Sequence, residues 1–314
     1  MNAWNLDMAG LEVEISSRHP LTALNADQFQ LFRSAGKKKG IRVFFHSIEK
    51  KELTGRRLDP ERDPLLSRAG RRGTRSPLLR SVHVQELLAA AGSHTDRLFV
   101  EMLPESLSVL DFKNNRADFF FMPGSGSTPA KRWLGPALLA PFLPRFDALL
   151  LHASAIVRHG RAAVFLAPDE GGKTTAVRLS PEGTILGDDQ IMVRRFKNRF
   201  QVSGTPWGLH IHGQALAPLA GLFLLEKADR FALAPLAARE LAPWIWDELK
   251  DSLFILPKPL KKKAFALICA IAAAVPAWRM SFPKDHIDWE AIDRTTSACE
   301  EQLRTRASRS VSRG

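Results

Sequence analysis

Cysteine is scarce in this sequence, and that limits the chemistry available to the chain. The two cysteines, Cys269 and Cys299, form neither a metal-ligand spacing nor a disulfide framework. A reducing, cytoplasmic environment is therefore expected. The N-terminal residues MNAWNLDMAG lack the basic, apolar and small-residue succession of a secretion signal, so we expect no such signal.

Long apolar runs are also missing. The longest, at 264–276, is too short to span a bilayer and directly follows a lysine cluster. It predicts a buried helix, and we expect no membrane partner.

Positive charge is in excess, with a formal net charge of +12, and much of it lies in clusters at 37–39, 56–57, 68–75 and 304–313. A basic surface suits nucleotides, acidic peptides or nucleic acid, and a solvated face or loose tail is the alternative. No aromatic residues interleave with these clusters, so base stacking has no support. Nucleic acid is therefore not the expected partner.

Residues 1–130 predict a small α+β domain with a basic loop near 50–80. Strands are expected at 11–15, 41–48, 98–103, 107–112 and 117–122, and the last three fit an antiparallel meander. Helices are expected near 24–32 and at 82–91. The stretch 123–129, PGSGSTP, predicts a linker.

Residues 131–290 predict an α/β domain with a mixed sheet, and 291–314 a C-terminal helix with a basic tail. Short helices are expected within 133–151. A tight turn at 158–160 should join two strands into a hairpin. Strands are expected at 151–157, 162–166, 184–194, 200–203, 219–225 and 277–282, and helices at 238–254 and 261–274.

The segment 162–179, AAVFLAPDEGGKTTAVRL, carries the main chemical signal. An apolar strand enters a glycine loop, and Lys173 and Thr174 then open a helix, the layout that cradles nucleotide phosphates. Lys173 can bridge the β- and γ-phosphates, and the Thr174 hydroxyl can bind Mg²⁺. The residues predicted to bind the nucleotide are Ala167, Pro168, Asp169, Glu170, Gly171, Gly172, Lys173, Thr174 and Thr175.

The loop departs from the pattern G-x-x-x-x-G-K-[ST] at its first position, Ala167. Pro168 restricts Ala167 to an extended conformation, which alanine tolerates. Asp169 and Glu170 are harder to accommodate, because carboxylates near phosphates repel them unless they turn outward.

Asp188 and Asp189 lie in the apolar stretch at 184–194. Successive side chains of a strand point to opposite faces, so one aspartate faces the phosphate loop unless the strand ends there. Gly187 makes a local distortion plausible. Buried carboxylates are costly without a cation, which favours Mg²⁺ binding or proton acceptance from a hydroxyl over a turn or a helix cap.

Four other side chains stay open to more than one interpretation. His152, on the strand beside the loop, is either an orienting group for phosphate or acceptor or a packed residue. His210 and His212 have period-2 spacing but no third ligand, which favours a structural role. Trp207 in GTPWG is either a substrate-side aromatic residue or a core anchor.

The succession LHASAIV, turn, AAVFLAPDEGGKTT and ILGDD resembles the HPr kinase/phosphorylase group of the phosphoenolpyruvate carboxykinase superfamily. GTPWG and VPAWRMSF resemble the divergent, HPr-kinase-related proteins of peptide-modification cassettes. The resemblance covers about residues 145–290. It implies an α/β P-loop kinase core in which His152, Lys173, Asp188 and Asp189 are catalytic and Thr174, Asp188 and Asp189 bind metal.

One departure limits what the resemblance implies. The Glu-Ile-Arg-Gly-Leu-Gly signature of bacterial HPr kinases is absent, and the chain reads HIHGQALAPLAG instead. The resemblance therefore does not extend to HPr as substrate or to the reverse phosphorolysis.

The sequence thus predicts an ATP- and Mg²⁺-dependent kinase for a serine or threonine hydroxyl on a small protein or peptide. The N-terminal domain would help to select the acceptor. One alternative is a nucleotide-binding regulatory or scaffold protein with weak or no phosphotransfer, and a second is a basic nucleic-acid-binding protein that uses the Arg-rich segments. A homo-oligomer is compatible with the kinase and with the scaffold.

Overall fold

The computed structural model describes residues 2–17, 27–35, 40–59, 63, 66, 70–73, 76–90, 98–102, 106–122, 134–207 and 213–297. The chain divides into two compact units. Unit 1 comprises Met1–Phe146 and Asp251–Lys263, and unit 2 comprises Asp147–Lys250 and Ala264–Gly314. Each unit has its own sheet with parallel and antiparallel pairs, so the fold is mixed α/β with two mixed sheets. The domain boundaries at 130 and 290 stay predictions.

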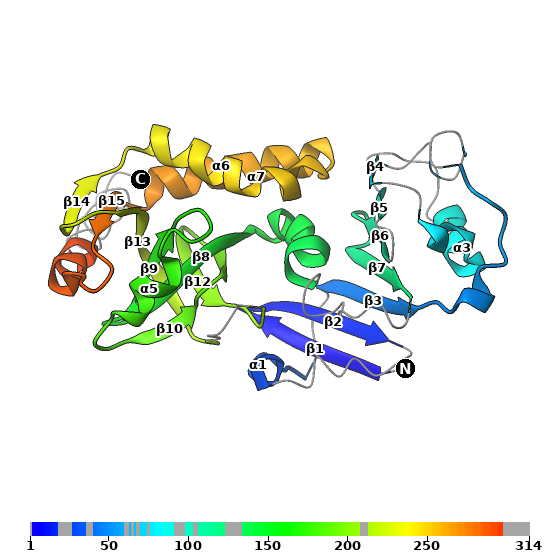
Figure 1. Cartoon of the computed structure of the whole chain (residues 1–314), viewed down its shortest axis with the longest axis horizontal. Helices are drawn as coiled ribbons and strands as arrows, with labels where there is room; N and C mark the ends of the chain where they lie inside the picture. The colour runs from blue at the N-terminus through cyan, green and yellow to red at the C-terminus, as the bar shows by residue number, and fades with distance from the viewer. Residues whose placement is uncertain are drawn as a thin grey trace, which may run out of the picture. The chain divides into compact units, whose positions relative to one another are not determined.

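Unit 1 contains a seven-stranded sheet in the order β1-β2-β3-β7-β6-β5-β4 (Figure 1). Its strands are β1 (Asn2–Met8), β2 (Leu11–Ser17), β3 (Ile41–Ser47), β4 (Gly70–Gly73), β5 (Leu98–Met102), β6 (Ser106–Asp111) and β7 (Arg116–Phe121). The predicted antiparallel meander of β5, β6 and β7 is confirmed. The prediction of a single strand before residue 35 is wrong, because β1 pairs with β2. Alternating burial of Trp4, Leu6 and Met8 anchors β1.

The helical segments of unit 1 are short. They are α1 (Asp27–Gln30), α3 (Val82–Ala90), the 3₁₀ segments η2 (Lys50–Glu52), η3 (Pro77–Arg80) and η5 (Ala140–Phe146), and the π-helical η4 (Leu134–Leu139). The expected short helices before residue 147 are confirmed, but helix does not extend to 151. The stretch 50–80 is not simply an exposed loop, because it contains η2, β4 and η3 and buries Leu58, Leu66, Leu78 and Leu79. The linker prediction at 123–129 lies outside the described residues.

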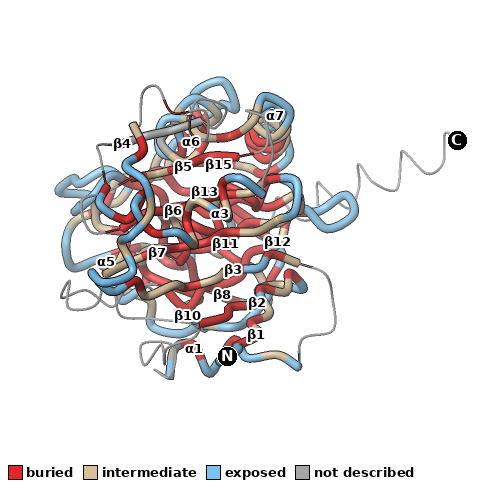
Figure 2. Tube along the Cα trace, turned by 90° about the vertical axis from the view of Figure 1, so that its right-hand side faces the viewer, coloured by how far each residue is buried: buried red, intermediate tan, exposed pale blue. Residues whose placement is uncertain are grey.

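Unit 2 contains an eight-stranded sheet in the order β10-β8-β11-β12-β13-β15-β14, with β9 beside both β8 and β13. Its strands are β8 (Ala148–Arg158), β9 (Arg161–Leu166), β10 (Thr184–Gly187), β11 (Gln190–Phe196), β12 (Arg199–Gly204), β13 (Leu216–Lys227), β14 (Ala232–Pro235) and β15 (Ala277–Phe282). The centre of β13 is continuously buried (Figure 2). Strands β9, β13 and β15 run parallel, so their carboxyl ends lie at one edge of the sheet.

Two long helices and a final helical stretch complete this half of the sequence. They are α6 (Ala238–Phe254), α7 (Lys258–Ala274) and residues 289–297. The predicted helices at 238–254 and 261–274 are confirmed, the second with three more residues at its start. No helix among the described residues combines the length and apolar character needed to cross a membrane.

The predicted hairpin of β8 and β9 is confirmed, with Arg158 opposite Arg161. The two turn residues, His159 and Gly160, have φ values of 48° and 74°. Positive φ at both central positions defines a type I′ turn, whose twist matches that of paired strands. The hairpin therefore leads straight into the loop after β9.

The prediction of one strand over 184–194 is wrong. Strand β10 ends at Gly187, β11 begins at Gln190, and Asp188 and Asp189 lie between them. Both strands pair with β8, and the register shifts between Ile185 and Gly187. An irregularity of this kind breaks the strict alternation of side chains that an unbroken strand imposes.

Candidate active site

The loop predicted to cradle phosphate joins β9 to α5 (Lys173–Arg178). Its last residue, Gly172, has a φ of 96°, in the left-handed region that favours glycine. A Cβ at this position would also lie 2.9 Å from Cζ of Phe282. Backbone conformation and packing therefore both require glycine directly before α5, which itself lies against β8 and β9 (Figure 1).

The first position of the loop does not require glycine. Ala167 is buried and is not among the residues with positive φ, as its neighbour Pro168 would dictate. The Ala167 methyl group instead constrains Gly171, where an added Cβ would lie 2.5 Å from Cβ of Ala167. Alanine at the first position thus depends on glycine at position 171.

Lys173 is buried at the start of α5, and its side chain joins the end of the loop to the beginning of the loop. Its Nζ donates hydrogen bonds to the carbonyl oxygens of Ala167 at 2.8 Å and Pro168 at 3.0 Å. Ser154 Oγ donates to the backbone carbonyl of Lys173 at 2.7 Å. These bonds hold the ammonium group inside the loop that would receive phosphate.

Burial lowers the pKa of Lys173, and the negative charges of Asp169, Asp189 and Glu248 only partly oppose that shift. The resulting pKa lies below the ordinary value of a lysine. A phosphate placed beside the ammonium would favour its charged form and raise the pKa again. Lys173 is therefore a cation whose charge an anionic ligand would stabilise.

The two acidic residues of the loop are both exposed. The Asp169 side chain is 91% exposed, and its Oδ1 lies 3.4 Å from Nε2 of His152. Glu170 has a φ of 58°, a left-handed conformation that costs a non-glycine residue about 1–3 kcal/mol. Both carboxylates are therefore open to solvent screening, and that of Asp169 stays near His152 and near the Lys173 ammonium, whose pKa it raises.

The aspartate pair lies next to the start of α5. Thr174 Oγ1 donates to the backbone carbonyl of Asp188 at 3.3 Å, which ties the loop to the gap between β10 and β11. The Asp188 side chain is buried at 1% exposure, whereas that of Asp189 is 19% exposed. The two aspartates thus have different access to solvent and to a substrate.

His152 on β8 lies among three carboxylates. Its Nε2 is 3.1 Å from Oδ1 of Asp189 as well as 3.4 Å from that of Asp169, and its Nδ1 is 3.9 Å from Oε2 of Glu248 on α6. The pairing of β8 with β11 places Gln190 opposite His152 and so brings Asp189 beside the imidazole. Sequence reasoning missed Glu248, because no local pattern links α6 to a strand almost a hundred residues earlier.

A cavity of about 340 Å³ adjoins the helix start. It lies where the parallel strands β13 and β15 end, the edge at which ligands bind in open α/β sheets. Its lining combines an aromatic ring, two lysines and one carboxylate with the predicted loop residues. The lining residues are Gly172, Thr175, Lys227, Ala228, Asp229, Phe282, Pro283 and Lys284. No local sequence pattern pointed to Lys227, Ala228, Asp229, Phe282, Pro283 or Lys284.

The residues predicted to bind a metal ion are oxygen donors at the helix start and in the aspartate pair. Within the described residues, no group of three or more His, Cys, Asp or Glu side chains is arranged to hold a metal ion. Mg²⁺ commonly uses one or two carboxylates and completes its shell with water and substrate phosphates. Thr174, Asp188 and Asp189 fit that mode of binding.

The remaining candidates from the sequence are Trp207, which lies away from the loop in the sequence, and two histidines outside the described residues. Trp207 is buried, as a core anchor would be. Its neighbour Thr205 donates through Oγ1 to the Gln190 carbonyl at 2.8 Å, which fixes this turn against β11. His210 and His212 lie outside the described residues.

No family model matches this chain, and its sequence matches no curated protein. Among solved structures, the Hpr(Ser) kinase/phosphatase from Coxiella burnetii is similar over 50% of this chain and 98% of its own. The identity is 11% and the TM-score is 0.26. A TM-score this low supports no conclusion about fold or function.

Proposed function

We propose that this chain binds ATP and Mg²⁺ and transfers a phosphoryl group to a serine or threonine hydroxyl of a small protein or peptide. The observation that carries the proposal is the contact between the phosphate loop and the aspartate pair, through Thr174 Oγ1 and the Asp188 carbonyl at 3.3 Å. Phosphoryl transfer needs positioning and charge neutralisation more than covalent chemistry. An ammonium, a hydroxyl and two carboxylates around one loop supply the groups for both.

The nucleotide would bind with its phosphates at the loop and its nucleoside in the adjoining cavity of about 340 Å³. That volume lies at the lower end of the range for small-molecule sites, about 300–1,000 Å³. The Phe282 ring offers an apolar surface, and Lys227 and Lys284 add positive charge. Lys173 supports the phosphate position because burial lowers its pKa and a neighbouring anion would stabilise its charged form.

Mg²⁺ would be held by Thr174, Asp188 and Asp189, and when bound it would neutralise charge that develops on the phosphate oxygens. Asp189 is the better candidate to accept the proton of the acceptor hydroxyl, because its side chain is partly exposed and that of Asp188 is not. His152, 3.1 Å from Asp189, would orient that carboxylate.

We also propose that unit 2 has an HPr-kinase-like core of the phosphoenolpyruvate carboxykinase superfamily. The order of hairpin, phosphate loop and aspartate pair along the sequence supports this assignment. Unit 1 would then contribute to the choice of acceptor.

The test combines MgATP binding by calorimetry with transfer from radiolabelled ATP to candidate peptides and small proteins. Lys173→Ala should weaken MgATP binding by roughly tenfold or more, because it removes charge-assisted bonds to phosphate. Asp189→Asn should lose transfer, and because Asp189 is only one of the three proposed Mg²⁺ ligands, it should weaken MgATP binding less than Lys173→Ala does. Lys250→Ala, which removes an exposed lysine of α6, is the matched control and should behave like the parent.

Transfer by Asp189→Asn at the parental rate would show that the proposed proton acceptor is wrong. Unchanged MgATP binding by Lys173→Ala would overturn the assignment of the loop. A parent that binds MgATP but transfers nothing to any acceptor would favour the regulatory or scaffold alternative.

A further inference from the structure

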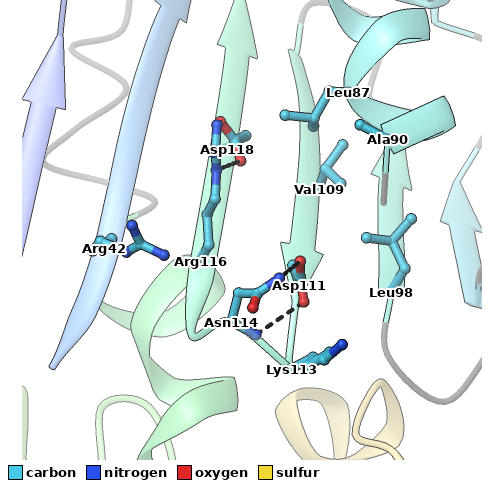
Figure 3. Close-up of a pocket in the computed structure, with 10 residues that line it drawn as sticks. All are labelled: Arg42, Leu87, Ala90, Leu98, Val109, Asp111, Lys113, Asn114, Arg116 and Asp118. Carbon is cyan, nitrogen blue, oxygen red and sulfur yellow. Dashed lines mark hydrogen bonds and ion pairs between the residues drawn. The ribbon is translucent and has the colours of Figure 1, made fainter. Parts of the chain in front are cut away.

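A second cavity, of about 290 Å³, lies entirely within unit 1 (Figure 3). The end of α3, four strands of the sheet and the turn between β6 and β7 surround it. One side, here called the apolar wall, consists of Leu87, Ala90, Leu98 and Val109. The other side, the cationic side, has Arg42, Lys113 and Arg116 as its cations, and Asp111, Asn114 and Asp118 complete the lining. The cavity therefore suits a ligand with one apolar part and one anionic part.

Strand register places Leu98 of the apolar wall in one row across the sheet with two arginines of the cationic side. Leu98 on β5 is opposite Asp111 on β6, Asp111 is opposite Arg116 on β7, and Arg116 is opposite Arg42 on β3. Figure 3 shows Arg42 extending from β3 toward β7. Two like charges in directly paired positions are unfavourable without a counter-charge. Arg116 has its counter-charge in Asp118, and Asp111 is opposite it in register, so Arg42 is the cation of this row that remains to bind an anionic ligand.

Arg116 is held in place by buried partners. Its Nε and Nη2 donate to the Asp118 carboxylate at 2.6 and 2.7 Å, and its guanidinium lies 4.3 Å from the Phe44 ring centroid. His46 Nε2 lies 2.8 Å from Oδ1 of the same carboxylate. Burial alone would raise the pKa of Asp118, but these hydrogen bonds and charges hold it below its ordinary value. Asp118 thus stays charged and holds the Arg116 guanidinium in place on the cationic side of the cavity.

Arg42 and Lys113 supply the remaining positive charge, and both are exposed. Among the described residues, no ion pair of Arg42 appears, although Glu14 is its register partner on β2. Asp111 accepts hydrogen bonds from the backbone N–H of Asn114 at 3.1 Å and from its amide Nδ2 at 2.7 Å. A carboxylate and an amide thus flank the cationic side and can pair with the N–H and C=O of a peptide group.

We propose that this cavity binds a peptide segment in which an aspartate or glutamate follows an aliphatic residue. The aliphatic side chain lies against the apolar wall, and the carboxylate binds Arg42 on the cationic side. The inference concerns unit 1 alone, and it stands or falls independently of phosphotransfer in unit 2.

The test uses the full chain with ¹⁵N-labelled arginine and follows the arginine side-chain signals by NMR. The probes are the acetylated and amidated dipeptides Leu-Asp, Leu-Asn and Ser-Asp. Leu-Asp should cause saturable shifts, whereas Leu-Asn lacks the carboxylate and Ser-Asp lacks the aliphatic group, so each should bind at least roughly tenfold more weakly.

Variants place the site on the structure. Arg42→Gln should weaken Leu-Asp binding by roughly tenfold, because it removes the charged donor. Ala90→Trp changes an exposed residue and should block the apolar wall. Arg80→Gln, an exposed arginine outside the cavity, should bind like the parent. Unchanged thermal unfolding verifies that each variant is folded.

Three results would overturn the proposal. They are equal binding of Leu-Asp and Leu-Asn, unchanged binding by both Arg42→Gln and Ala90→Trp, and the lack of saturable Leu-Asp binding up to its solubility limit. A parent chain that does not bind MgATP would contradict the proposed function and leave this inference intact.

Discussion

Replacing Asp293 with asparagine should destabilise unit 2 by removing one partly buried ion pair. Arg158 at the end of β8 is only 8% exposed, and its Nη2 lies 2.7 Å from Oδ2 of Asp293. The guanidinium also donates to Ser180 Oγ at 3.0 Å and to the Glu182 carbonyl at 2.8 Å, and it lies 5.1 Å from the Trp289 ring centroid. Arg158 therefore joins the β8–β9 hairpin, the turn after α5 and the helical stretch 289–297.

The size of the effect follows from burial. Removing one partner of a fully buried pair costs about 3–5 kcal/mol, and a hydrogen bond to a charged group contributes about 1.5–3 kcal/mol. Asp293 is 21% exposed and Arg158 keeps its other acceptors, so the lower range applies. We expect a loss of about 2 kcal/mol, equivalent to a melting temperature about 4–8 °C lower for a unit of this size.

The loss should depend on pH in a defined direction. Burial would raise the pKa of Asp293, but the Arg158 hydrogen bonds and charge, with His159 nearby, hold it below the ordinary value of 3.8. A carboxyl whose folded-state pKa is lowered stabilises the fold above its unfolded pKa and loses that contribution as pH falls through the folded value. The difference between parent and Asp293→Asn should therefore be full at neutral pH and shrink below about pH 4.

Urea unfolding followed by circular dichroism across this pH range measures the difference. The double variant with Arg158→Met isolates the coupling between the two side chains. Glu290→Gln is the matched control, because Glu290 lies on the same helical stretch in an exposed pair with Arg294. A loss at neutral pH below about 0.5 kcal/mol, the range of ordinary surface substitutions, would refute the reasoning. So would a loss that stays constant down to pH 3.

Four more predictions concern Gly172, Gly160, Ala167 and Lys173. Gly172→Ala should abolish MgATP binding and cost about 1–3 kcal/mol, because the new methyl group would meet Phe282 at a left-handed position. Gly160→Ala, also left-handed but with open space around its Cβ position, should keep MgATP binding and cost about 1 kcal/mol. Ala167→Gly should leave MgATP affinity unchanged, and a gain would show that alanine impairs the loop. MgATP binding should take up protons at alkaline pH, because phosphate raises the lowered pKa of Lys173. Calorimetry in buffers of different ionisation enthalpy measures this uptake, and its absence would contradict the role of Lys173.

Local sequence signals predicted the parts of unit 2 that depend on adjacent residues. The β8–β9 hairpin follows from His159-Gly160, where both residues adopt positive φ. The strand, loop and helix around Lys173 follow from apolar periodicity and glycine. These features need no contact between distant segments, and so the sequence was sufficient to predict them.

Features made by long-range contacts were not predictable in the same way. The gap between β10 and β11 depends on β8, which pairs with both strands, and on a register shift inside β10. Glu248 comes from α6, and much of the lining of the cavity beside α5 comes from the ends of β13 and β15, so both reach the loop only through long-range contacts. Gly187 indicated that a break was plausible, but it could not show which aspartate would stay accessible.

The acidic loop is compatible with phosphate binding because water screens the repulsion from the exposed Asp169 carboxylate more than it screens the attraction of the buried Lys173 ammonium. Two unit charges 4 Å apart interact by about 1 kcal/mol in water, but by about 4 kcal/mol at the effective dielectric of a protein surface. The Asp169 carboxylate is 91% exposed, so its repulsion of a phosphate lies near the lower value. Lys173 is buried, so its attraction lies near the higher value. Asp169 can therefore stay beside His152 without cancelling the charge that would hold a phosphate.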